Sequence, residues 1–189
     1  MKVKQQLTRK YYKYITVESS WTQPVLSSNG TIGVDDFAVS ATDTRKGEAY
    51  YPFTSNNYWA GNANCTYTMY SNNPLCIKRL GFSGIYQSGA VYMSTFTFSA
   101  SNDGNSWIDL GTFKNNTYNF TNFDVNNNNF YKYYKITAKY GGIIKNIQLT
   151  ATQKITTIVE STKDDYDFYK DVIALSAFIV NNVYKAKKF

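Results

Sequence analysis

Aromatic and amide side chains gather between residues 43 and 62, and together these residue types can recognise a sugar. The apolar face of a sugar ring stacks on an aromatic ring, while its hydroxyls hydrogen-bond to planar amide or guanidinium groups. The segment supplies both kinds of group, in Arg45, Tyr50, Tyr51, Phe53, Asn57, Tyr58 and Trp59. We take these residues as a candidate ligand-binding site. The alternative is that they pack over one end of the fold, and for Trp59 we favour a place in the core, because an indole buries a large area.

Catalytic chemistry is hard to build from this sequence. The 189 residues include no His, so the commonest general base and neutral metal ligand is missing, and the 13 acidic residues show no catalytic pairing. Two cysteines, Cys65 and Cys76, are too few for a zinc site. They flank the turn-like Ser71–Pro74, so they either form a disulfide across it or, as we favour, are free buried thiols. We therefore expect no enzyme activity, no catalytic residue and no metal site.

The alternation of apolar and polar residues predicts strands before residue 155. Runs typical of strands occupy residues 11–17, 65–70 and 75–82. The clearest hairpin is expected over 92–113, where Asp103-Gly104 suits a turn that needs positive φ. Many short strands with regular turn signals are typical of an antiparallel sandwich or barrel, which we assign to residues 20–152.

Two further segments complete this region. A second hairpin is expected from Phe130 to Leu149, with Gly141-Gly142 as its turn. Between the hairpins, residues 115–129 are rich in Asn and are interpreted as a polar surface loop.

The two ends of the chain differ from its middle. Residues 1–19 are expected to form a basic arm and a first strand, and residues 160–187 a helix with a cap and acidic residues at Thr162–Asp165. An apolar stripe follows the helix: Phe168, Val172, Leu175, Ile179 and Val183. This stripe is a candidate oligomerisation or docking surface, and packing against the chain's own sandwich is an equally supported alternative.

The net charge of +7 comes largely from Lys and Arg near the two ends. We interpret these as solvated termini and expect no nucleic-acid binding. The first residues lack the apolar core of a signal peptide, and the longest apolar run, residues 172–180, is too short to cross a bilayer. We expect synthesis in the cytoplasm and no membrane insertion.

The segment from Phe96 to Phe113 resembles a known hairpin. Its Ser-Asn-Asp-Gly-Asn-Ser-Trp stretch is similar to the S-x-D-G-x-x-W motif of discoidin domains, also called coagulation-factor type C or galactose-binding-like domains. Other segments that resemble the family follow in its order: Ala38–Asp43, Trp59, Ile77–Phe82, Tyr133–Ile136 and Ile147–Leu149.

The resemblance implies an all-β, antiparallel jelly-roll sandwich that binds glycans, lipids or proteins through loops at one end. Within it, Asp103 and Gly104 would form the turn and Trp107 would anchor the core. No cofactor is implied except a calcium ion, and Asp43-Thr44, where the family usually has Asp-Gly, argues against calcium. Lys135 stands where an Arg is common.

These features lead to a functional hypothesis of a non-catalytic module in a bacteriophage particle. Asn- and Tyr-rich chains with Trp-Thr-Gln-Pro-Val near the start are similar to phage tail or head-fibre proteins. The module would act in the virion, as a homo-oligomer, on a host-surface glycan or another virion protein. The alternative is a stand-alone carbohydrate-binding module of an enzyme system.

Overall fold

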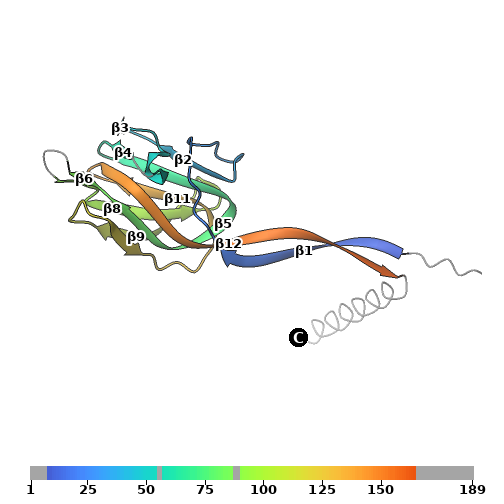
Figure 1. Cartoon of the computed structure of the whole chain (residues 1–189). Coiled ribbons are helices and arrows are strands. Elements are labelled where there is room, and N and C mark those ends of the chain that lie inside the picture. The colour runs from blue at the N-terminus through green and yellow to red at the C-terminus, as the bar shows by residue number, and fades with distance from the viewer. Residues whose placement is uncertain (1–7, 55–56, 87–89, 165–189) are drawn as a thin grey trace, which may run out of the picture. The chain divides into compact units, whose positions relative to one another are not determined.

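The computed structural model describes residues 8–54, 57–86 and 90–164, whose regular structure is β-strand apart from the short 3-10 turn η1 at Tyr51–Phe53 (Figure 1). The strands are β1 Thr8–Ser20, β2 Phe37–Ala41, β3 Thr44–Lys46, β4 Tyr58–Gly61, β5 Cys65–Ser83, β6 Ile85–Tyr86, β7 Ala90–Val91, β8 Thr95–Ser101, β9 Ile108–Lys114, β10 Thr121–Asp124, β11 Tyr131–Ala138 and β12 Gly142–Asp164. The chain divides into two compact units, residues 17–155 and the two chain ends. In the described part of the end unit β1 pairs with β12, and the hydroxyls of Thr16 and Thr156 are 2.9 Å apart.

The long strand β5 organises the unit of residues 17–155, because it is hydrogen-bonded in both layers of a sandwich (Figure 1). Its first half lies between β2 and β11, and β8 and β9 follow beyond β11. Its second half lies between β12 and β10, and β4 and β3 follow beyond β12. All these pairings are antiparallel, so the expected all-β antiparallel architecture is confirmed.

Aromatic side chains from both layers fill the core. The fully buried ones are Trp59, Tyr67, Phe82, Phe96, Phe98 and Tyr134. For example, the centroid of the Phe96 ring lies within 5.5 Å of the centroids of three other rings, those of Phe82, Phe113 and Phe123. Each such ring contributes about 1.5–3 kcal/mol by leaving water. The many aromatic residues of the sequence therefore serve first to hold the two layers together.

The hairpin expected over 92–113 is present as β8 and β9. Its turn is held by the Asp103 carboxylate, whose Oδ1 accepts bonds of 2.8 Å from the amides of Asn105 and Ser106, and these bonds lower the pKa of Asp103. Gly104 has φ +76°, in the left-handed region that favours glycine. Trp107 differs from expectation, because it is half-buried rather than central. The ammonium of Lys135 lies 3.9 Å from the centre of its ring, so a cation–π contact covers the indole.

At two positions where we expected a turn between paired strands, the chain changes layers instead. Ser71–Pro74 is not a turn between strands but the bulge at which β5 passes from one layer to the other. Ser71 is buried and donates to the carbonyl of Asn73 at 2.7 Å. The bulge tolerates Pro74, which has no amide hydrogen to donate, because the regular strand ladder is interrupted there. Cys65 and Cys76 do not form a disulfide across the bulge, because both thiols are free and buried. Burial raises the pKa of the Cys65 thiol.

The second expected hairpin is also wrong. Its strands exist, but β11 pairs with β5 and β8 while β12 pairs with β4 and β5, so the chain changes layers at Gly141 and Gly142. A Cβ on Gly141 would lie 2.6 Å from the carbonyl oxygen of Gly61, so the glycine permits a close crossing of two chain segments rather than a hairpin turn.

The Asn-rich segment 115–129 is not simply a surface loop, because it contains β10. Phe123, Val125 and Asn127 are buried and alternate with exposed residues, which is the period of a strand. The buried Asn127 amide donates to the Ile77 carbonyl and the Tyr134 hydroxyl, both at 3.4 Å. An inward-facing asparagine concealed this alternation from sequence analysis.

The helix expected from residue 160 does not begin there, because β12 continues to Asp164. β12 pairs with β1, and residues 162–164, which we interpreted as part of a helix cap, belong to this strand. The stripe Phe168, Val172, Leu175, Ile179 and Val183 and the first residues of the basic arm lie outside the described residues. None of the described segments is a helix that could span a membrane.

Candidate functional site

Two of the predicted ligand-binding residues are core residues. Trp59 is 0% exposed, and its indole Nε1 donates to the Thr44 hydroxyl at 2.9 Å. Phe53 is 5% exposed, and its ring lies 5.3 Å from that of Phe37. A fully buried indole cannot stack on a sugar, so the core-packing alternative holds for Trp59, and Phe53 is assigned to packing in the same way.

Three others lie outside the site described below. Tyr50 and Tyr51 are half-buried and pack edge to face, with ring centroids 4.9 Å apart. The amide of Tyr50 donates to the side-chain oxygen of Asn29 at 2.9 Å, so this part of the loop is fixed. Asn57 is exposed and lines neither of the depressions below.

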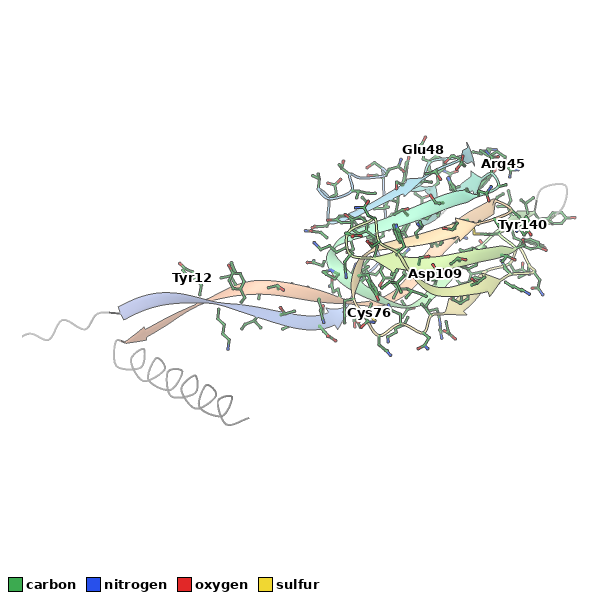
Figure 2. The ribbon with its side chains drawn as sticks, turned by 180° about the vertical axis from the view of Figure 1, so that it is seen from behind. Tyr12, Arg45, Glu48, Cys76, Asp109 and Tyr140 are labelled. Carbon is green, nitrogen blue, oxygen red and sulfur yellow. The ribbon has the colours of Figure 1, made fainter. Side chains whose placement is uncertain are left out.

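Arg45 and Tyr58 remain, and they lie on a hollowed surface. One depression of about 420 Å³ is lined by Tyr58, Ser83, Gly84, Ile85, Tyr86, Tyr118 and Lys145. A second of about 350 Å³ is lined by Arg45, Lys46, Tyr58, Ala60, Ile85, Val91 and Ile143. Because Tyr58 and Ile85 belong to both, the depressions adjoin, and we call them together the tyrosine surface. Arg45 lies on β3 at one end of the sandwich (Figure 2).

Exposed tyrosine rings form one side of this surface. The rings of Tyr86 and Tyr118 are 5.5 Å apart at 51°, and they are 67% and 37% exposed. A pair of open phenol rings offers both a stacking face and hydroxyls to a ligand. Sequence analysis missed both residues because they stand in short polar segments with no strand period.

Gly84 fixes the two tyrosines relative to each other. Its amide donates to the carbonyl of Tyr118 at 2.9 Å. A Cβ on this glycine would lie 2.3 Å from the carbonyl oxygen of Val91, which belongs to the partner strand of the β6–β7 ribbon. The close approach of the two backbones therefore requires glycine, and it places Tyr86 beside Tyr118.

Basic groups form the other side. Lys145 pairs with Tyr58 across β12 and β4, and Lys46 pairs with Ala60 across β3 and β4. The Lys46 ammonium lies 5.4 Å from the centre of the Tyr58 ring. Neither ion pair of the described residues uses Arg45, Lys46 or Lys145; Arg45 and Lys46 are exposed, and Lys145 is half-buried.

A third, wider depression is a competing candidate. Its volume is about 720 Å³, and its lining includes the exposed Val25 and Phe120. The amide of Gln23, which also lines it, already bonds to the Ile147 carbonyl at 2.8 Å and to the Leu149 amide at 2.7 Å. The site lacks charged groups and has fewer free polar ones, so we favour the tyrosine surface.

Acidic and thiol side chains are not grouped in the described part of the chain. This part contains no cluster of three or more Cys, Asp or Glu side chains placed to hold an ion. The position where calcium was considered has Asp43 at φ +51°, with its carbonyl accepting from the Asn62 amide at 2.8 Å. The groups that line the tyrosine surface are instead aromatic rings, hydroxyls and cations, which suit the binding of an organic ligand.

Comparison with known proteins identifies the fold. No family model and no curated sequence matches the chain. Among solved structures, a family 32 carbohydrate-binding module from Clostridium perfringens in complex with GalNAc-β-1,3-galactose has a TM-score of 0.54 at 11% identity, covering 61% of this chain and 95% of that one. The family 32 module of C. perfringens NanJ in complex with galactose has a TM-score of 0.51 at 10% identity, covering 74% and 100%.

A third structure, the family 32 module of AlyQ in complex with 4,5-unsaturated mannuronic acid, has a TM-score of 0.51 at 15% identity and covers 59% of this chain and 92% of that one. The chain therefore has the galactose-binding-like sandwich fold of these modules. This confirms the fold implied by the discoidin-like hairpin.

Proposed function

We propose that the chain is a non-catalytic module that binds glycan on the tyrosine surface. The observation that carries the proposal is the exposed Tyr86–Tyr118 pair beside a depression that also contains Tyr58. A sugar ring can stack on the open phenol faces while its hydroxyls bond to the tyrosine hydroxyls. The fold supports the proposal, since the three similar structures described above are carbohydrate-binding modules, each in complex with a sugar.

The experiment is a glycan array with the purified chain, followed by calorimetric titration of the strongest ligand. Tyr86→Ala and Tyr118→Ala should each weaken binding about fivefold, the loss of about 1 kcal/mol of stacking. Phe120→Ala is the matched control, because Phe120 is 40% exposed, close to the 37% of Tyr118, but lines the third depression. Loss of binding in Phe120→Ala with none in the tyrosine variants would place the ligand in the other depression and refute this site.

The setting of the module is a separate part of the proposal. On the basis of the sequence, we propose that the module is a virion component that forms a homo-oligomer and contacts a host glycan or a neighbouring virion protein. Another similar structure is a module of a family 31 glycoside hydrolase from C. perfringens, and this supports the enzyme-system alternative at least equally. Neighbouring genes for particle proteins would favour the first setting, and neighbouring genes for glycoside hydrolases the second. Light scattering on the full chain tests the oligomer.

A further inference from the structure

We propose that the glycan is acidic, with a sugar carboxylate held beside Tyr58 by Arg45, Lys46 and Lys145. This inference rests on the proposed function and adds the chemical class of the ligand. The tyrosine surface carries three cations, and no Asp or Glu lines either of its depressions. A neutral sugar needs hydroxyl and amide partners, whereas this surface concentrates charge of one sign.

The strand register brings the cations to one place. Lys145 is the cross-strand partner of Tyr58, and Lys46 and Arg45 come from β3, the strand on the other side of β4. Tyr58 is therefore flanked by basic residues from both neighbouring strands. A sugar ring stacked on or beside Tyr58 would place a ring carboxylate within reach of an ammonium group on either side.

The nearest acidic residues in sequence do not neutralise these charges. The Glu48 carboxylate accepts from the Asn29 amide at 3.3 Å. Asp43 lies close enough to Cys65 to help raise the pKa of that thiol. Among the described residues, neither Glu48 nor Asp43 forms an ion pair with these three cations.

The size of the surface favours an acidic sugar over a nucleic acid. Depressions of about 350 and 420 Å³ suit one or two sugar rings. Single-stranded nucleic acid is bound in extended basic grooves that follow several phosphates. The three cations among the lining residues lie on β3 and β12, the two strands that flank the strand of Tyr58, and this short span matches a single carboxylate better than a phosphate chain.

The test uses pairs of glycans that differ only in their acid groups. Galacturonate oligomers are compared with the same oligomers after carboxyl reduction, and sialyllactose with lactose, by calorimetric titration at 50 and 300 mM salt. At least one acidic glycan should bind with a Kd at least about fivefold lower than that of its neutral counterpart. The higher salt concentration should weaken binding of the acidic glycan, because ions screen exposed charges. Lys145→Gln and Lys46→Gln should each weaken binding of the acidic glycan about twofold to fivefold, and should weaken binding of its neutral counterpart by a smaller factor.

Matched variants control for general effects of charge. Lys145→Arg keeps the charge and should retain binding, and Lys114→Gln removes an exposed charge from β9, outside the tyrosine surface, and should change nothing. Equal binding of acidic and neutral members, or equal loss from Lys114→Gln, overturns the acidic-glycan inference while leaving the proposed function intact. No binding of any glycan, with tight binding of single-stranded DNA instead, overturns both.

Discussion

Removing one buried hydroxyl should test how the two layers are joined. Tyr134 lies on β11 and is 1% exposed, and its hydroxyl donates to the carbonyl of Leu75 at 2.6 Å. The same hydroxyl accepts from the Ile77 amide and the Asn127 side chain, both at 3.4 Å. Tyr134 thus holds β5 just after its bulge, where the strand enters the second layer.

The expected cost of Tyr134→Phe follows from these three bonds. One short bond has a net value of about 0.5–1.5 kcal/mol, and leaving a buried partner without its bond costs about 1–3 kcal/mol. We therefore expect the free energy of unfolding to fall by about 2 kcal/mol, which lowers the melting temperature by roughly 4–8 °C for a domain of this size.

The assay is urea unfolding followed by tryptophan fluorescence and circular dichroism, with the m-value checked for constancy. Tyr133→Phe is the control, because Tyr133 is half-buried and its hydroxyl bonds to no group in the described part of the chain. This neighbour should change stability by less than about 0.5 kcal/mol. If both variants unfold at the same urea concentration, the Tyr134 hydroxyl does not stabilise the passage of β5 between layers.

Three further predictions concern pH, the tyrosine surface and the thiols. Burial holds the pKa of Tyr67 well above its ordinary value of 10.0, so above that pH the unfolded state releases a proton that the folded state retains. The free energy of unfolding should therefore fall as pH rises from 9 to 11. Urea titrations across this range should show a less steep fall in Tyr67→Phe. Gly84→Ala should separate β6 from Val91 and weaken glycan binding, measured by calorimetry, at least as much as loss of one tyrosine. Unchanged binding would contradict the positioning role of Gly84. Cys65 and Cys76 should resist a thiol reagent in the native protein and both react after unfolding without reductant, whereas a disulfide would leave them unreactive.

Much of the fold could be predicted because its signals are local. The alternation of Phe96 and Phe98 with threonines, and the Asp103-Gly104 turn, define the β8–β9 hairpin within one short segment. The exchange of strands between layers could not be predicted in this way. It depends on which distant strand accepts each backbone, and both Ser71–Pro74 and Gly141-Gly142 have the composition of ordinary turns.

The candidate site was predicted only in part, for a related reason. Arg45 and Tyr58 were identified from composition, but a loop residue and a core residue of the same type look alike in sequence, as Trp59 shows. Tyr86, Tyr118 and Lys145 come from three separate segments. Only the folded chain brings them to one surface, so no spacing rule could have joined them.

The bulge in β5 has a practical consequence for anyone who modifies this protein. From its composition, Ser71–Pro74 looks like the natural place to graft an affinity tag or a fluorophore. Because the strand passes there from one layer to the other, an added peptide would have to be accommodated in the middle of a continuous strand and would disturb both layers at once. The exposed side chain of Asn102, which precedes the Asp103 turn, is the better point of attachment for a fluorophore.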